Sequence, residues 1–100
     1  MSATSTQERT PAAGIDLQEE TVITGRVVDD SGQTVGGASV RLLDDRQEFT
    51  AELIASASGD FRFFAAPGTW TVRALSRVGQ GDVTVARAGA GIHEIDVKVA

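Results

Sequence analysis

The feature that most constrains this chain is the alternation of apolar and polar residues in short runs from Thr21 onward. Successive side chains of a β-strand point to opposite faces, so each run predicts a strand with one buried face and one outward face. The runs are rich in β-branched and aromatic residues, and clusters of Gly, Asp, Ser and Pro separate them. No segment keeps a helical period over about ten residues, so the sequence predicts an all-β fold.

Seven such runs follow one another at the spacing typical of a β-sandwich. They lie within residues 21–30, 36–45, 48–56, 59–66, 69–75, 81–87 and 91–100. The run at 81–87 is the weakest because glycines flank it, and we expect this region to form turns and a flexible flap. The sequence therefore predicts a seven-stranded antiparallel β-sandwich of the Greek-key type over residues 21–100. Residues 1–20 are rich in Ser, Thr, Ala and Gln and predict a flexible tail.

The stretch "SASGDFRFFAAPGTWTVRAL", Ser56–Leu75, contains the bulkiest apolar residues in alternating positions. They are Phe61, Phe63, Trp70 and Val72. Pro67 fixes φ and Gly68 allows positive φ, which suits the centre of a type II turn. We therefore expect a hairpin here whose aromatic side chains point inward and supply much of the core.

The composition excludes several classes of function. The net charge is −5 and the pI is about 4.6, whereas nucleic acid and anionic membranes require a net basic surface. The chain has no cysteine, so no disulfide and no thiolate can form. The first residues lack the basic and apolar regions of a signal peptide, and no apolar run approaches the ~20 residues that span a bilayer. We expect a cytoplasmic protein.

Two segments, "ITGRVVDDSGQTVGGASVRL" and "SGDFRFFAAPGTWTVRAL", resemble the carboxypeptidase regulatory-like domains. In these domains a V-x-G-x-V-x-D strand leads through a glycine turn to G-A-x-V. A G-x-F-x-F strand then leads through Pro-Gly to an aromatic-x-V strand. The resemblance implies a prealbumin-like (transthyretin-like) sandwich.

A closer resemblance covers nearly everything after Leu17. "EETVITGRVVD", "ASGDFRFFAAPGTWTVRALS" and "AGIHEIDVKVA" are similar to a small actinobacterial family of unknown function. Its members tend to be encoded beside thiosulfate sulfurtransferases of the rhodanese type, which implies a link to sulfur metabolism and such an enzyme as partner. Many members open with a Cys-Ser-Gly stretch that this chain lacks, so the chain cannot carry sulfur on a cysteine by itself.

Catalytic chemistry finds little support in the residues. His93 is the only histidine, and we interpret it as a surface residue of an edge strand because no orienting partner is evident. The serines have no Ser-His-acid context. Intradiol dioxygenases, which have a related fold, bind iron through Tyr and His, whereas this chain has no Tyr. We assign no catalytic, cofactor-binding or metal-binding residue, and we expect the protein not to be an enzyme.

Two other patterns have an alternative reading. The pairs at residues 29–30 and 44–45 are Asp-Asp at strand ends, where Asp either binds calcium or caps a turn, and the spacing favours turns. Trp70 either stacks on a sugar or belongs to the core, and its alternation with Val72 favours the core.

A partner surface is the remaining hypothesis. Arg26, Arg41, Arg62 and Arg73 occupy outward positions on four strands, and Phe64 is an outward aromatic residue. If these strands share one sheet, the arginines form a basic stripe suited to an oxyanion or an acidic partner. The alternative is that the arginines pair with Glu52, Asp60 or their neighbours. A homodimer through this face stays open.

These observations favour a non-enzymatic binding or accessory module that acts through a sheet face. A cell-envelope or carbohydrate-binding module is the first alternative, since many carboxypeptidase regulatory-like domains serve in that way. A sulfur-transfer enzyme is the second, and the lack of cysteine argues against it.

Overall fold

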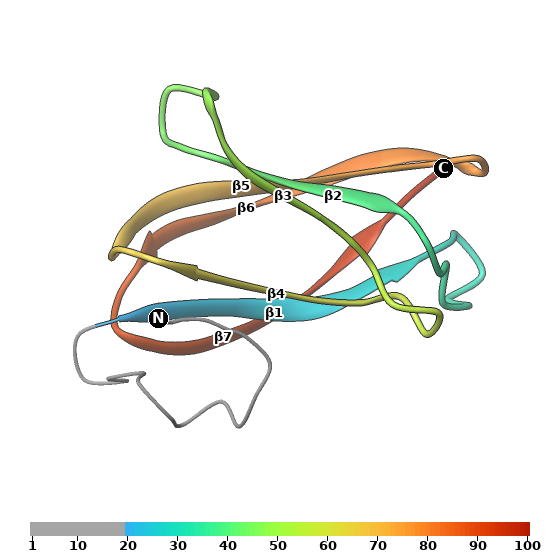
Figure 1. Cartoon of the computed structure of the whole chain (residues 1–100), viewed down its shortest axis with the longest axis horizontal. Helices are drawn as coiled ribbons and strands as arrows, with labels where there is room; N and C mark the ends of the chain where they lie inside the picture. The colour runs from blue at the N-terminus through green and yellow to red at the C-terminus, as the bar shows by residue number, and fades with distance from the viewer. Residues whose placement is uncertain (1–19) are drawn as a thin grey trace.

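The computed structural model of the chain describes residues 20–100, which form strands, turns and loops (Figure 1). The seven strands are β1 (Thr21–Val28), β2 (Ser39–Leu43), β3 (Phe49–Ile54), β4 (Asp60–Ala65), β5 (Gly68–Ser76), β6 (Gly79–Ala88) and β7 (Gly91–Lys98). The predicted tail lies outside the described residues except for Glu20. The described part of the chain contains no helix long and apolar enough to cross a membrane. The prediction of a seven-stranded all-β fold is confirmed.

The strands form two sheets, which lie as two layers in Figure 1. Sheet A has the strand order β4-β1-β7, and sheet B has the order β3-β2-β5-β6. Neighbouring strands are antiparallel except for β1 and β7, which are parallel. A parallel pair needs a long crossover connection, and the strands between β1 and β7 supply it. The predicted antiparallel sandwich is therefore correct apart from this one pair.

The predicted hairpin at Ser56–Leu75 does not form. β4 pairs with β1 in sheet A, whereas β5 pairs with β2 and β6 in sheet B. The chain passes between the sheets through Ala66 and Pro67, at the left of Figure 1. Gly68 has a φ of 159°, far from the roughly +80° of a type II turn. The two aromatic runs therefore face each other across the core instead of lying side by side in one sheet.

The core lies between the two sheets and is built from the inward positions of the alternating runs. The buried residues of this cluster are Ile23, Val27, Ala38, Val40, Leu42, Ala55, Phe61, Phe63, Val72, Ala74, Val97 and Val99. The predicted inward direction of Phe61, Phe63 and Val72 is confirmed. Trp70 packs against this cluster but is only partly buried, and its Nε1 donates a hydrogen bond to the Ala66 carbonyl oxygen at 2.8 Å.

One lateral side of the sandwich is closed by main-chain contacts between β6 and the end of the chain. The strand predicted at 81–87 is present within β6, which spans ten residues, so the expectation of turns and a flap in this region is wrong. Gln80 and Ala100 exchange main-chain hydrogen bonds of 3.4 and 3.2 Å. A Cβ atom at Gly81 would collide with the Lys98 carbonyl oxygen, so glycine permits this close approach. The glycines that suggest flexibility instead join the two sheets.

Candidate binding surfaces on the two outer faces

The four predicted arginines do not share one sheet. Arg26 on β1 and Arg62 on β4 lie in sheet A, whereas Arg41 on β2 and Arg73 on β5 lie in sheet B. The outer faces of the two sheets point in opposite directions, because the core lies between them. The hypothesis of a single basic stripe is therefore wrong, and Phe64 accompanies only the arginines of sheet A.

Carboxylates neutralise three of these arginines. The ion pairs are Arg26 Nε to Asp60 Oδ1 (3.1 Å), Arg41 Nε to Glu52 Oε2 (3.0 Å) and Arg73 Nη2 to Asp82 Oδ2 (3.1 Å). Arg62 forms no ion pair with a carboxylate of residues 20–100. The alternative interpretation, in which arginines pair with Glu52 and Asp60, is confirmed. Exposed pairs of this kind each contribute about 0–1 kcal/mol, so their main effect is to balance the charge of the surface.

The outer face of sheet B carries one row of charged side chains across its four strands. Glu52 on β3 lies opposite Arg41, Arg41 lies opposite Arg73, and Arg73 lies opposite Asp82 on β6. Like charges directly opposite each other are unfavourable, but here each guanidinium is held by a carboxylate on its other side. The row is neutral as a whole, so it offers no free charge to an oxyanion.

The carboxylate of Glu52 in this row is held by two different side chains. The Ser39 hydroxyl and the Arg41 guanidinium both donate hydrogen bonds to Oε2, and they lower the pKa of Glu52 below its ordinary value of 4.5.

We expect the stability difference between the native chain and Glu52→Gln to depend on pH. A lowered native-state pKa stabilises the fold at neutral pH, and this contribution decreases as the pH falls below 4.5 and disappears once Glu52 is protonated in the native state. Urea denaturation of both proteins at a series of pH values measures this. A difference that stays constant from neutral to acidic pH would contradict the assignment.

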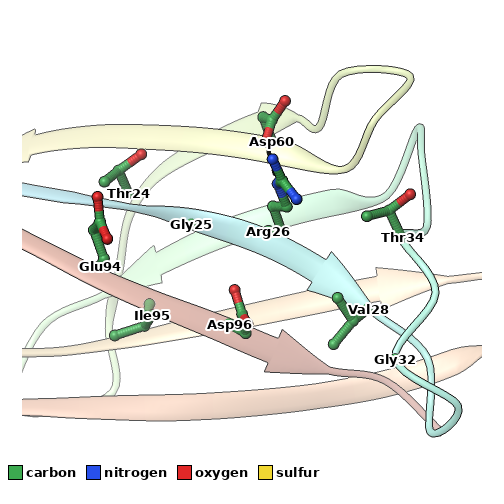
Figure 2. A pocket seen from close by; sticks show the side chains of 10 residues that line it. All are labelled: Thr24, Gly25, Arg26, Val28, Gly32, Thr34, Asp60, Glu94, Ile95 and Asp96. Carbon is green, nitrogen blue, oxygen red and sulfur yellow. Dashed lines mark hydrogen bonds and ion pairs between the residues drawn. The ribbon is translucent and has the colours of Figure 1, made fainter.

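The outer face of sheet A contains an open groove of about 600 Å³ (Figure 2). Three carboxylates and one guanidinium line it together with Thr24, Gly25, Val28, Gly32, Thr34 and Ile95. Arg26 lies between Asp60 on β4 and Asp96 on β7, and Thr24 lies between Arg62 and Glu94. The groove is therefore acidic as a whole, the opposite of the predicted basic stripe.

An apolar row lies on the same outer face, next to this groove. Val22 on β1 is flanked by Phe64 on β4 and Ile92 on β7. Phe64 is 41% exposed and Ile92 is 56% exposed, whereas Val22 between them is buried. Adjacent exposed apolar side chains beside charged groups are typical of interaction surfaces.

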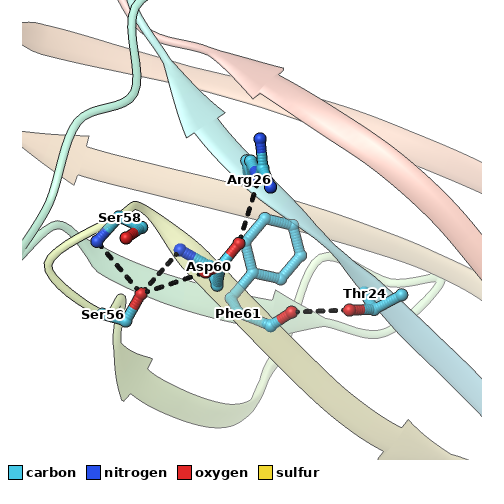
Figure 3. Close-up of polar contacts among 6 residues, drawn as sticks. All are labelled: Thr24, Arg26, Ser56, Ser58, Asp60 and Phe61. Atoms are coloured by element: carbon cyan, nitrogen blue, oxygen red, sulfur yellow. Dashed lines mark hydrogen bonds and ion pairs between the residues drawn. The ribbon is translucent and has the colours of Figure 1, made fainter.

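The turn that follows β3 fixes the position of Asp60 (Figure 3). The Ser56 hydroxyl oxygen accepts hydrogen bonds from the main-chain N–H groups of Ser58 (3.2 Å) and Asp60 (3.1 Å). The Ser56 main-chain N–H donates to the Asp60 carbonyl oxygen at 3.0 Å. Asp60 is thereby held beside Arg26, and Thr24 Oγ1 donates to the Phe61 carbonyl oxygen at 3.0 Å in the same region. The wall of the groove on the β4 side is therefore ordered by local turn chemistry.

The Asp-Asp pairs are turn residues, as the spacing predicts. Asp29 Oδ1 accepts hydrogen bonds from the N–H groups of Ser31 and Gln33, both at 2.9 Å. Asp44 Oδ1 accepts equivalent bonds of 2.9 Å from the N–H groups two and four residues later. Within the described residues, no group of three or more His, Cys, Asp or Glu side chains is placed to hold a metal ion.

The single histidine has no partner for acid–base chemistry among the described residues. His93 lies on the edge strand β7, and its Nε2 is 2.9 Å from the Gly89 carbonyl oxygen. The edge-strand position agrees with the interpretation. The side chain is half-buried and shares the inward positions of β7 with Ile95 and Val97. A catalytic histidine needs a nucleophile or a carboxylate within hydrogen-bond reach, and the contacts of His93 show neither.

Sequence reasoning missed the residues that β7 contributes to the outer face of sheet A. Ile92, Glu94 and Asp96 alternate with inward residues, so their outward direction is evident from the pattern. The residues that lie beside them on β1 are not evident from the sequence. The pairing of β7 with β1 joins residues about 70 positions apart, and no local pattern encodes it.

The sequence model of the family described as "Protein of unknown function (DUF1416)" matches residues 2–99. An uncharacterized protein of Mycolicibacterium smegmatis is 78% identical over 88 residues, which are 88% of this chain and 98% of the relative.

Two solved structures share the fold at low sequence identity. A DUF3823 family protein from Parabacteroides merdae has a TM-score of 0.63 and 20% identity, covering 82% of this chain and 46% of the other. Chlorocatechol 1,2-dioxygenase from Pseudomonas putida has a TM-score of 0.64 and 9% identity, covering 86% of this chain and 62% of the other. This chain thus spans less than two thirds of either structure, and the likeness concerns the β-sandwich alone.

Proposed function

Because the chain belongs to the DUF1416 family of proteins of unknown function, we propose a role from its surface: a non-enzymatic module that binds a protein partner. The partner docks on the outer face of sheet A, over the acidic groove and the apolar row beside it. The observation that carries this proposal is the exposure of Phe64 and Ile92 on the face that holds Glu94 and Asp96.

The chemistry of this face indicates the chemistry of the partner. Apolar side chains of the partner would cover Phe64 and Ile92, and Lys or Arg side chains would reach the carboxylates of the groove. Arg26 already pairs with Asp60, so Glu94 and Asp96 supply the excess negative charge. Charge complementarity of this kind mainly sets specificity and the association rate, whereas the apolar contacts supply most of the affinity.

The partner implied by the family resemblance is a thiosulfate sulfurtransferase of the rhodanese type, in the cytoplasm. We propose that such an enzyme docks on the outer face of sheet A. Without cysteine the chain would act as an accessory subunit and not as a sulfur carrier. Fractionation of cells of the native host tests the location.

A carbohydrate-binding role has less support from the side chains. Sugar recognition commonly uses an exposed aromatic platform, but Trp70 packs against the core. The exposed Phe49 belongs to sheet B and Phe64 to sheet A, so the described residues do not bring them together on one face.

The experiment is a pull-down from native cytoplasm with the wild-type chain and two matched variants as baits. Ile92→Lys places a cation within the proposed face, and Val78→Lys makes a similar change at a residue of similar exposure (50%) in the β5–β6 turn. We expect recovery of a sulfurtransferase with the wild type and Val78→Lys, and its loss with Ile92→Lys. Recovery of the same proteins with all baits would remove this face from consideration.

A further inference from the structure

The two lateral sides of the sandwich differ in how their strand edges are covered. Main-chain hydrogen bonds close the β6 side, as described above. On the other side β3 and β4 are edge strands of different sheets, and no strand ladder joins them within residues 20–100. A groove of about 710 Å³ opens between them, lined by Thr24, Leu53, Ile54, Ser56, Asp60, Phe61, Arg62 and Phe64. A free strand edge of this kind is a template for pairing with another strand.

The hydrogen-bond pattern determines which groups of β4 are free. Val27 N–H donates one hydrogen bond to the Gly59 carbonyl oxygen, so residues 27 and 59 are a pair in which main-chain groups of the two strands point toward each other. Such pairs alternate along an antiparallel ladder, and residues 61, 63 and 65 therefore direct their main-chain groups to β1. Asp60, Arg62 and Phe64 direct theirs away from β1. Ser56 already binds the main-chain groups of Asp60 through its hydroxyl and its own N–H. Within residues 20–100, Arg62 and Phe64 therefore form the free edge.

We propose that a second copy of the chain occupies this edge, with β4 antiparallel to β4 of the other copy and Arg62 opposite Phe64. A twofold axis through Phe63 then gives four main-chain hydrogen bonds, and sheet A continues as β7-β1-β4-β4-β1-β7. The inference goes beyond the proposed function, and its test needs no other protein. The dimer shares Phe64 with the proposed partner face but leaves Ile92 and the acidic groove uncovered.

Other registers would also place free main-chain groups of the two copies opposite each other. The residues that each register aligns decide among them. Placing Arg62 opposite Arg62 brings two guanidinium groups together, and like charges directly opposite each other are destabilising. Placing Phe64 opposite Phe64 aligns Arg62 with Ala66, which lies beyond the end of β4 and is followed by Pro67. Only the register with Arg62 opposite Phe64 uses all four free groups, and it sets each guanidinium against an aromatic ring of the other copy. Arg62, which has no carboxylate partner among the described residues, thereby gains a neighbour.

The test is the dimerisation constant measured by sedimentation equilibrium for wild type, Phe64→Glu and Phe64→Arg. The register predicts opposite effects for two variants that both remove the ring. An introduced carboxylate lies opposite Arg62 of the other copy, and an introduced guanidinium repels it, at two symmetric contacts. We expect a reversible wild-type dimer and about tenfold or more weaker dimerisation of Phe64→Arg than of Phe64→Glu.

A charge swap provides the control. The double variant Arg62→Glu/Phe64→Arg restores opposite charges across the axis and is expected to dimerise about as well as Phe64→Glu. Circular dichroism verifies that each variant is folded, which the 41% exposure of Phe64 favours. A wild-type chain that stays monomeric at its highest soluble concentration would overturn the proposal. Equal weakening by both single variants, or no rescue by the double variant, would also overturn it.

Discussion

Replacing Gly25 by alanine is expected to destabilise the fold by about 3 kcal/mol or more, although the change adds a single methyl group. Gly25 lies at the centre of β1, between β4 and β7. A Cβ atom there would overlap the Ile95 carbonyl oxygen and would lie 3.2 Å from the tip of the Phe61 ring. The obstacle is main chain on the β7 side, so no change of side-chain rotamer can relieve it.

Gly89→Ala is the matched control, because a Cβ atom at that glycine meets no atom within 4 Å. Chemical denaturation of both variants measures the difference in the free energy of unfolding. Similar stability of Gly25→Ala and Gly89→Ala would contradict the close packing of β7 against β1.

Phe61→Ala is expected to cost about 3–5 kcal/mol, the range typical of removing a buried phenylalanine. Phe61 is 4% exposed, its ring covers Gly25, and its centroid lies 6.2 Å from that of Phe63. The cavity would open on the inner side of sheet A, over Gly25 of β1. Gly25 has no side chain that could fill it.

Phe49→Ala is the control for this second substitution, since Phe49 is 62% exposed and its loss should change stability by less than about 1 kcal/mol.

Combining Phe61→Ala with Gly25→Ala separates the two obstacles at Gly25. Removal of the ring leaves the Ile95 carbonyl oxygen in place, so the double variant should be no more stable than Gly25→Ala alone. Recovery of stability would show that the ring, and not the main chain of β7, excludes a side chain at Gly25.

The sequence identifies the strands and the two Asp-capped turns because these depend on neighbouring residues. The alternation from Thr21 onward places the inward residues correctly, and the capping roles of Asp29 and Asp44 depend only on the next four residues. The pairing of the strands cannot be predicted in this way, because it depends on residues far apart in the chain. Pro67-Gly68 suggests a hairpin, but the same residues also suit a link from one sheet to the other.

The candidate site could be predicted only in part for the same reason. The outward direction of Arg26, Arg62 and Phe64 follows from alternation, and the structure places all three on sheet A. Arg41 and Arg73 follow the same pattern, yet they lie on the opposite face. Deciding between one stripe and two faces requires the sheet topology, and finding the acidic groove requires the pairing of β7 with β1.

The most direct test of the proposed binding face is a calorimetric titration of the purified chain with a rhodanese-type sulfurtransferase of the same organism. We expect saturable binding that Ile92→Lys weakens by about tenfold or more, whereas Val78→Lys changes it by less than about twofold. An absence of binding, or equal losses with the two variants, would contradict the assignment of the outer face of sheet A as the partner surface.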